Sequence, residues 1–189
     1  KRMRFSFNVV GTETGRWSSS KTSFGGGMNA QNITEEIRHI FISSPSHKMG
    51  YVDLEQAESW GVALLSGDEA YLKACGSGDL HTSVTKLIWP TLEWTNDPKA
   101  DRAIADQPFY RQFSFRDMAK RGGHGSNYFG KPRTMAKFLK IEPSVMEEFQ
   151  GKYFKAFPGI REWQYRTATQ LQSRGFLTTP FGRKRHFLG

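Results

Sequence analysis

The sequence predicts an α+β fold in which short antiparallel strands accompany a larger set of helices. Two helices are predicted late in the chain, because apolar residues recur at helical spacing from Pro143 to Phe157 and again after the Pro158-Gly159 break. Alternating apolar and polar residues predict a strand at residues 3–10. A Pro-Phe-Gly turn predicts a hairpin from Arg174 to His186. These signals favour a helical body with small strand pairs.

Composition limits the class of protein. With 189 residues, of which 37% are hydrophobic, the chain can bury the core of one domain or somewhat more. A formal net charge of +9 indicates an acidic partner, with nucleic acid ahead of a membrane surface or an acidic protein. Cys75 is the sole cysteine, which is typical of a reducing interior. No apolar run approaches the roughly 20 residues that cross a bilayer, so we expect a soluble intracellular protein.

The first third of the chain is polar and rich in turn residues. Only three residues separate Gly11 from Gly15 and no Gly-Lys-Ser/Thr follows, so this segment is not a Walker phosphate-binding loop. A short turn or helix and the start of a strand are predicted from Thr34 to Ile42, before a Ser/Pro loop.

An apolar run, an acid and a helical pattern follow one another in residues 48–68. This order predicts a buried strand with Asp53 at its exposed end, and then a helix whose apolar face contains Ala57, Trp60, Leu64 and Leu65. A carboxylate in that position can bind Mg²⁺, which takes one or two carboxylates together with substrate phosphates. A helix N-cap is the alternative role for Asp53.

Further along, a helix continues from Thr82 to Trp89. Residues 90–108 are predicted to form a looser insert, since prolines and an Asn-Asp pair interrupt them. We assign this insert no function. The aromatic residues of the two late helices are predicted to form a core rather than a base-stacking platform.

A row of potential cations recurs every four residues at Arg116, Lys120 and His124, and therefore falls on one face of a helix. Such a row suits a polyanion, because each donor can bind a different phosphate oxygen. From the spacing alone, a solvated basic face is the alternative. Gly125 permits close approach of another group, and Tyr128 adds an aromatic ring at the end of the helix.

Taken together, these motifs resemble DNA polymerase family A, the DNA polymerase I family, in a viral or phage-like form. The resemblance rests on TGRWSSS with Gln31-Asn32-Ile33, on VDLEQAESWGVALLSGD, on Asp79-Leu80-His81, on RDMAKRGGHGSNYFG, and on FPG followed by FGRKRHF. They occur in the order of the family and cover nearly the whole chain. Two positions depart from its usual pattern: His124 stands where Phe or Tyr is usual, and Phe129 separates a Tyr and a Gly that are commonly adjacent.

In the fingers helix of that family, the resemblance implies that Arg116 and Lys120 bind the triphosphate of the incoming nucleotide. His124 would lie against its sugar and base, and Tyr128 near the templating base. His81 would be directed toward the phosphates. Gly122, Gly123 and Gly125 each cost a helix about 1 kcal/mol relative to Ala, which suggests a segment that rotates when nucleotide binds.

For the palm, the resemblance implies that Asp53 and the backbone carbonyl of Leu54 bind Mg²⁺. Glu58 would block a ribose 2′-OH, and Gln56 would supply the amide that lies between Asp53 and Glu58 in the motif.

Near the primer end, the resemblance implies that Arg16 reaches the minor groove of DNA, assisted by Gln31 and Asn32. Acceptors in that groove are nearly the same for every base pair, so a donor can check shape without reading sequence.

The implied architecture is a partial palm at residues 1–80, helical fingers at 81–175, and a hairpin returning toward the palm at 176–189. The implied reaction is attack of a primer 3′-OH on the α-phosphate of a deoxynucleoside triphosphate, with Asp53 and Lys120 acting in the chemical step. Primer-template DNA, deoxynucleoside triphosphates and Mg²⁺ would be its partners, in the cytoplasm of a bacterial or virus-infected cell and without a membrane.

The family supplies a second metal-binding aspartate from a His-Asp motif after the hairpin, and this sequence ends at Gly189 without one. We therefore expect a palm and fingers fragment that is inactive or very weak alone. Two alternatives stay open: a nucleic-acid-binding module, and one half of a split polymerase that needs the remainder of the enzyme as its partner.

Overall fold

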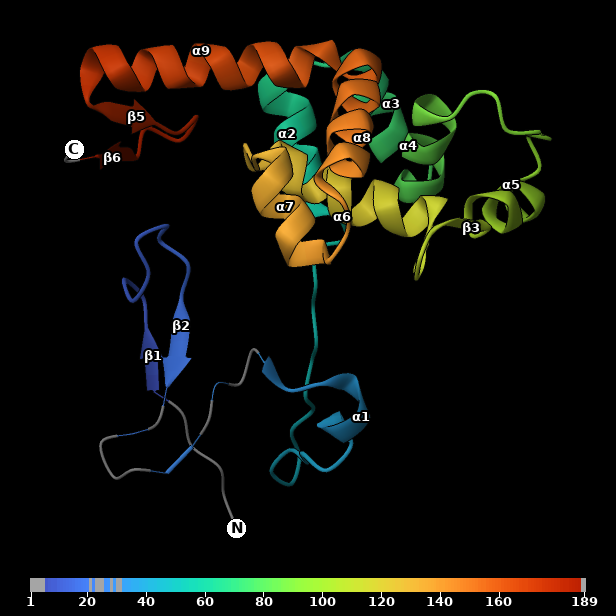
Figure 1. Cartoon of the computed structure of the whole chain (residues 1–189). Helices are drawn as coiled ribbons and strands as arrows, with labels where there is room; N and C mark the ends of the chain where they lie inside the picture. The colour runs from blue at the N-terminus through green and yellow to red at the C-terminus, as the bar shows by residue number, and fades with distance from the viewer. Residues whose placement is uncertain (1–5, 21, 23–25, 28, 30–31, 188–189) are drawn as a thin grey trace. The chain divides into compact units, whose positions relative to one another are not determined.

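The computed structural model describes residues 6–20, 22, 26–27, 29 and 32–187 of the chain. The chain divides into two compact units, Lys1–Asp53 and Leu54–Gly189, and each is described by itself (Figure 1). Helices predominate, and the strands form small antiparallel pairs. The predicted α+β class is confirmed. The predicted functional division at residues 80 and 175 stays a prediction.

The first unit contains one strand pair and one short helix. Strand β1 (Ser6–Asn8) pairs antiparallel with β2 (Ser18–Ser20), which confirms the predicted strand over residues 6–8. Helix α1 (Glu35–Arg38) is a single turn, and residues 39–42 continue as a turn and irregular chain instead of the expected strand.

The predicted buried strand before Asp53 is wrong. Residues 47–54 have no regular secondary structure, and the exposed fractions of Tyr51, Val52 and Leu54 are 65%, 89% and 75%. A buried strand needs neighbours that satisfy its backbone and cover its faces. No described strand pairs with this segment, so its apolar residues remain exposed.

The second unit is a helical bundle with two small hairpins. Its helices are α2 (Ala57–Ser66), α3 (Glu69–Cys75), α4 (Leu80–Ile88), α5 (Pro98–Ala105), α6 (Phe115–Asn127), α7 (Pro132–Leu139), α8 (Pro143–Ala156) and α9 (Pro158–Arg174). Its strands are β3 (Pro108–Tyr110), β4 (Phe113–Ser114), β5 (Phe176–Thr178) and β6 (Lys184–His186).

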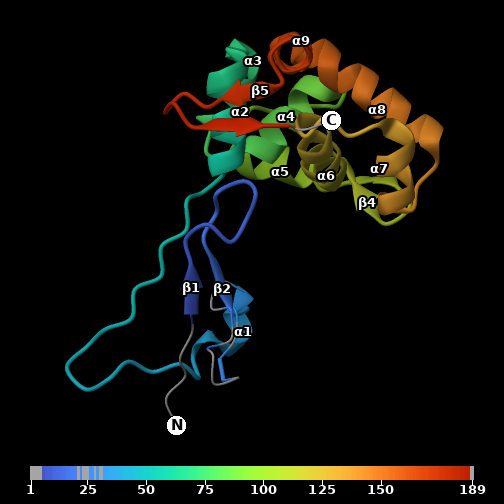
Figure 2. The ribbon, with the colours of Figure 1, turned by 90° about the vertical axis from the view of Figure 1, so that its left-hand side faces the viewer.

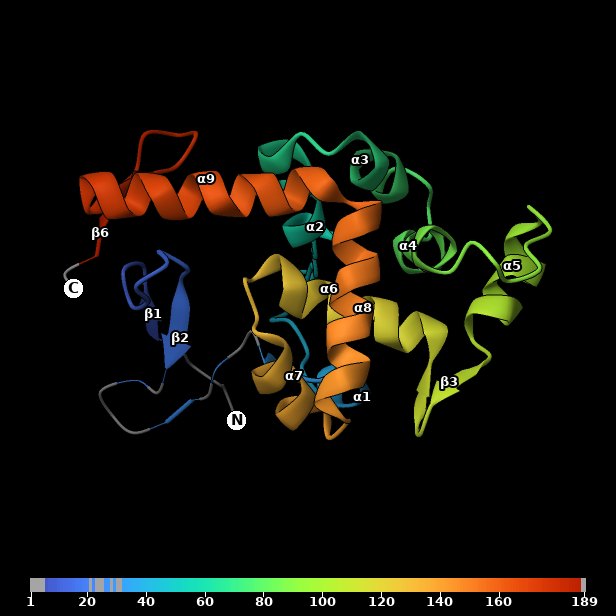
Figure 3. The same cartoon turned by 45° about the horizontal axis from the view of Figure 1, so that its top comes forward.

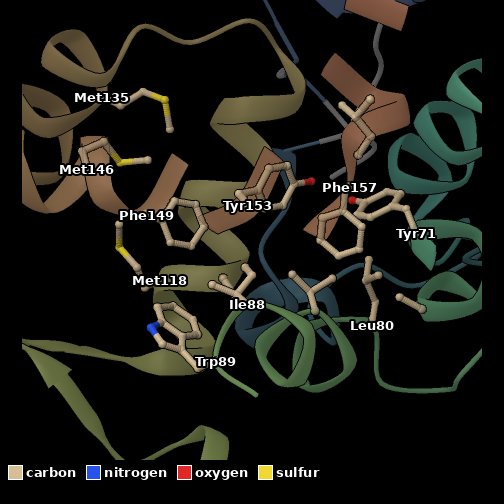
Figure 4. Packing of buried hydrophobic residues seen from close by; sticks show 14 of the residues in the cluster. Tyr71, Leu80, Ile88, Trp89, Met118, Met135, Met146, Phe149, Tyr153 and Phe157 are labelled. Atoms are coloured by element: carbon tan, nitrogen blue, oxygen red, sulfur yellow. The ribbon is translucent and has the colours of Figure 1, made fainter. Parts of the chain in front are cut away.

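Helix α8 lies at the centre of the core and packs against α4, α6 and α7 (Figure 3). Its residues Phe149 and Tyr153, with Phe157 directly after it, are buried, and Trp89 packs against Phe149 at a ring-centroid distance of 5.9 Å (Figure 4). The prediction that these aromatic residues form a core is confirmed. Aromatic rings contribute most here because each buries a large apolar surface.

Helix α9 begins in the core and then runs beyond it (Figure 3). Ile160 is buried, whereas Trp163, Thr167 and Leu171 on the same predicted face are only partly buried. The predicted hairpin is confirmed: β5 pairs antiparallel with β6, and β5 packs beside α9 (Figures 1 and 2).

The predicted helix after Asp53 is confirmed as α2, but its predicted apolar face is not buried. Trp60, Leu64 and Leu65 are exposed, and Ala63 is buried instead. Among the described elements, α2 has substantial contact only with α3 and α9. These two helices cover one narrow side of it.

The insert at residues 90–108 is more ordered than predicted. Asp97 caps α5 by accepting hydrogen bonds from the backbone N–H groups of Lys99 and Ala100, at 3.1 and 2.8 Å. Pro98 occupies the first turn, where its missing N–H is not needed. The buried Asp101 accepts a hydrogen bond from Lys86 Nζ of α4 at 2.6 Å. The bond between Lys86 and Asp101 fixes α5 against α4.

Candidate functional site

Helix α6 presents the predicted cation row on its outer side. Its start is fixed by a capping box, in which the Asp117 N–H donates to Ser114 Oγ at 3.0 Å and Asp117 Oδ2 accepts from the Ser114 N–H. The helix that begins here leaves Arg116 partly exposed and Lys120 and His124 exposed. The expected common face is therefore confirmed.

The opposite side of α6 is packed tightly against α8. A Cβ atom on Gly122 would lie 2.5 Å from the Phe149 ring, and one on Gly123 would lie 3.1 Å from the Tyr153 ring. Both glycines are buried within the helix. They permit close helix packing in this conformation, and their suggested part in a rotation of the fingers stays a prediction.

Two buried glutamines secure the carboxyl end of α6, and the sequence analysis missed both. Gln164 Nε2 of α9 donates to the carbonyl groups of Ser126 and Asn127 at 2.7 and 3.2 Å. Gln150 Nε2 of α8 donates to the Gly130 carbonyl at 2.8 Å. The last carbonyl groups of a helix have no partner within it, so the bonds from Gln164 satisfy those of Ser126 and Asn127, and Gln150 holds the chain just after the helix. The available signal was a glutamine placed among the apolar residues of each packed helix.

Asn127 joins the same end of α6 to the core. Its Nδ2 donates to the Tyr71 hydroxyl at 3.0 Å, and its Oδ1 accepts from the Tyr153 hydroxyl at 2.7 Å. Tyr128 follows as the C-cap residue and is exposed, and Phe129 has a left-handed φ of 64°. Glycine adopts that conformation without strain, whereas Phe does not.

A carboxylate at the start of α4 connects this helix to the cation row. Asp79 is the N-cap of α4 and accepts from the Thr82 N–H at 3.2 Å and from its hydroxyl at 2.9 Å. Arg116 Nη2 donates to Asp79 Oδ1 at 3.0 Å, and Arg102 Nη1 of α5 donates to Asp79 Oδ2 at 3.1 Å. Burial raises the pKa of Asp79, but the bonds from Arg116 and Thr82 outweigh it and hold that pKa below its ordinary value.

His81, in the first turn of α4, lies within the electrostatic field of the same cations. Its burial, followed by the positive charges of Arg116 and Lys120, lowers its pKa from 6.5 to about 4. The imidazole is therefore neutral at neutral pH and can donate one hydrogen bond. The bond from Arg116 to Asp79 joins the start of α4, which carries His81, to the cation row on α6.

The other end of the row meets α2. His124 Nδ1 lies 3.8 Å from Glu58 Oε2, and the ring centroids of His124 and Tyr128 are 4.9 Å apart. Gln56, directly before α2, has a left-handed φ of 55°, and its Nε2 donates to Glu55 Oε1 at 3.5 Å. His124 thus has both Glu58 and Tyr128 as neighbours, and the roles expected for these three residues stay predictions.

This chain is similar to known proteins over nearly its whole length. The family model for DNA polymerase family A matches residues 1–189. The chain belongs to DNA polymerase family A. The thermostable DNA polymerase I of Thermus filiformis is 30% identical over 98% of this chain, and DNA polymerase I of Rhizobium leguminosarum is 30% identical over 97%. The DNA polymerase of Mycobacterium phage D29 is 26% identical over 78% of the chain.

Among solved structures, the POL domain of Pol1 from M. smegmatis, in complex with DNA primer-template and dNTP, matches with a TM-score of 0.74 and 26% identity. The match covers 98% of this chain and 30% of that one. The chain spans only 20% of the Thermus filiformis enzyme and 17% of the Rhizobium enzyme. The predicted family resemblance is confirmed.

The resemblance also singled out Asp53, Leu54, Arg16, Gln31 and Asn32. Asp53 ends the first unit and is exposed, and Leu54 begins the second. Arg16 and Asn32 are exposed residues of the first unit, and Gln31 lies outside the described residues. The roles expected for these five residues stay predictions.

Metal ligands do not gather in the described part of the chain, where no group of three or more His, Cys, Asp or Glu side chains could hold an ion. Asp53 with one carbonyl group falls short of the six or so oxygen ligands that Mg²⁺ takes, so these residues do not form a magnesium site by themselves.

Across the described residues, no helix has the length and apolar character needed to span a membrane.

Proposed function

We propose that α6 and the start of α4 bind the triphosphate of an incoming deoxynucleoside triphosphate during template-directed DNA synthesis. The observation that carries this proposal is the bond from Arg116 to Asp79, which joins the start of α4, where His81 lies, to the helix that carries Lys120 one turn after Arg116. Membership of DNA polymerase family A supports it, as does the structural match to a polymerase domain in complex with primer-template and dNTP.

Each of these residues has a distinct task toward the phosphates. Arg116 offers a planar guanidinium group whose N–H donors match phosphate oxygens, and Lys120 offers a compact point charge. Neutral His81 donates one hydrogen bond without adding charge. In the proposed reaction, the primer 3′-hydroxyl gives up its proton to solvent and its oxygen forms a bond to the α-phosphorus. The bond from that phosphorus to the bridging oxygen breaks, and pyrophosphate leaves. Arg116 and Lys120 stabilise the negative charge that develops on it.

The sugar and base would lie toward the other end of the row. His124 and Glu58, 3.8 Å apart, would contact the sugar, and Tyr128 would stand next to the templating base. Gln56 would support Glu58 from the residue before α2. On the DNA side, Arg16, Gln31 and Asn32 would contact the minor groove near the primer end. Mg²⁺, bound to Asp53 and the Leu54 carbonyl with phosphate oxygens, would stabilise phosphate charge.

Nucleotide binding by the 189-residue chain tests the proposal directly. Calorimetric titration with dATP should give weaker binding for Lys120→Ala by about tenfold or more, because a charge-assisted bond contributes about 1.5–3 kcal/mol. Lys152→Ala is the matched control, since Lys152 is a partly exposed cation on α8 paired with Glu148. Equal binding by the wild type, Lys120→Ala and Lys152→Ala would refute the triphosphate site.

Primer extension tests the finer part of the proposal. A polypeptide of these 189 residues contains no His-Asp pair after the hairpin, so we expect little or no extension by it alone. Activity that appears on mixing with a polypeptide carrying such a motif would support the split-polymerase alternative. Robust extension by the unmixed polypeptide would refute the expectation that a second aspartate is required.

A further inference from the structure

Helix α5 brings a second arginine to the carboxylate that holds Arg116. Arg102 Nη1 and Arg116 Nη2 donate to the two oxygens of Asp79 at 3.1 and 3.0 Å. Arg102 also pairs through Nε with Asp106, one helical turn later, at 2.9 Å. The guanidinium group of Arg102 is thus fixed beside the start of α4, although its helix belongs to the insert that had no assigned function.

We propose that Arg102 is an additional phosphate-binding residue of the nucleotide site, contributed by α5 and oriented by Asp79. This inference rests on the proposed function of α4 and α6. Its chemical class of ligand is the terminal phosphates of a nucleoside triphosphate, which a guanidinium group recognises through its planar array of N–H donors.

The balance of charge favours a phosphate-binding role over a purely structural one. Arg102, Arg116 and Lys120 bring three cations, and Asp79 and Asp106 offset two of them, so an excess of positive charge remains. The side chain of Arg102 is 49% exposed, and its N–H groups other than those on Asp79 and Asp106 are available to a ligand.

Two further observations place Arg102 in the same electrostatic environment as the triphosphate residues. The positive charge of Arg102 is one of the causes that lower the pKa of His81, after burial and the charges of Arg116 and Lys120. In addition, α5 is a rigid support, because the buried Asp101 binds both Lys86 of α4 and the Thr95 N–H. Rigid support of this kind is what a binding residue needs in order to keep its geometry.

Titration of the 189-residue chain with dATP, and separately with inorganic tripolyphosphate, tests the inference. For Arg102→Ala we expect a loss of affinity of about three- to tenfold for both ligands, because a partly exposed charge pair is screened by solvent. Arg102→Lys keeps the charge and should recover part of the loss. Lys99→Ala is the matched control, since it removes an exposed cation from the same helix, and it should change affinity by less than about twofold.

The outcomes separate this inference from the proposed function. If Lys120→Ala weakens binding and Arg102→Ala does not, Arg102 is not a phosphate-binding residue and the proposed function stands. If neither variant weakens binding, the proposed function fails. Titration with deoxyadenosine, which carries no phosphate, separates the two roles. A structural role of Arg102 would reduce the affinity for deoxyadenosine as well, and Arg102→Lys would then give no recovery. That pattern overturns the inference, with circular dichroism confirming that each variant is folded.

Discussion

The close approach of α6 to α8 makes Gly122→Ala an informative perturbation. The added Cβ would lie 2.5, 2.8 and 2.9 Å from three atoms of the Phe149 ring, which is closer than real contacts allow. Phe149 is buried, and the ring centroids of Trp89 and Tyr153 each lie 5.9 Å from its own. Because the ring cannot turn away freely, the helices must separate or the core must repack.

The expected effect is the difference between two opposing terms. Adding a methyl group to a packed core costs about 1–3 kcal/mol, and the fixed Phe149 ring places this site near the upper value. Replacing Gly by Ala in a helix contributes about 1 kcal/mol in the opposite direction. We therefore expect Gly122→Ala to lower the free energy of unfolding of the second unit by about 2 kcal/mol.

Gly151→Ala is the control, because Gly151 lies within α8 and a Cβ there would meet nothing within 4 Å. It should raise the free energy of unfolding by about 0.5–1 kcal/mol. Both changes are measured by urea unfolding followed by circular dichroism, with the midpoint and slope compared between variants. If Gly122→Ala proved as stable as Gly151→Ala, α6 and α8 would be shown to separate without cost, and the packing argument would be refuted.

Three further predictions concern the residues around the site. Tyr153→Phe leaves Asn127 Oδ1 without its hydrogen-bond donor, so urea unfolding should show a free energy of unfolding that is lower by about 1–3 kcal/mol. An unchanged urea midpoint would contradict this. Phe129→Gly removes the backbone strain of a non-glycine residue at φ 64°. It should raise the melting temperature by an amount that corresponds to about 1 kcal/mol in the free energy of unfolding. A lower melting temperature would show that contacts of the Phe129 ring contribute more stability than its backbone strain costs. His81 has a pKa of about 4 in the folded chain against 6.5 ordinarily, so the unfolded state binds more protons between these values. The free energy of unfolding should fall by about 1–2 kcal/mol more in the wild type than in His81→Gln when the pH drops from about 7 to about 5; equal falls would contradict the lowered pKa.

Local features of the second unit were predictable from the sequence, because they depend on residues a few positions apart. The cation row on α6 follows from a spacing of four, and the core faces of α8 follow from apolar residues at helical intervals. Helix α5 was predictable too, since Asp97 before Pro98 is a recognisable helix start, but the breakers around it were given more weight. The buried strand before Asp53 was wrong because burial depends on partner strands that its own residues do not specify.

The acidic partner of Arg102 and Arg116 could not be predicted from the sequence. Asp79 is 23 residues from Arg102 and 37 from Arg116, and the sequence offers 18 acids as possible partners. Which acid is used depends on how α4, α5 and α6 pack, and that packing is set by buried residues that carry no charge. In the same way, Gln150 and Gln164 have polar partners only because the end of α6 lies between α8 and α9.

Asp79 shows why position in the fold decides how the site should be probed. Its carboxylate caps α4 and binds two arginines at once, so replacing it would remove a helix cap and release both cations together. A loss of nucleotide binding in such a variant would not distinguish an unfolded helix start from a disordered phosphate site. Arg102 lies on a separate helix and takes no part in the cap, and Lys99 on that helix is its natural control. The arginine, rather than the acid that holds it, is therefore the residue at which phosphate binding and helix stability can be measured apart.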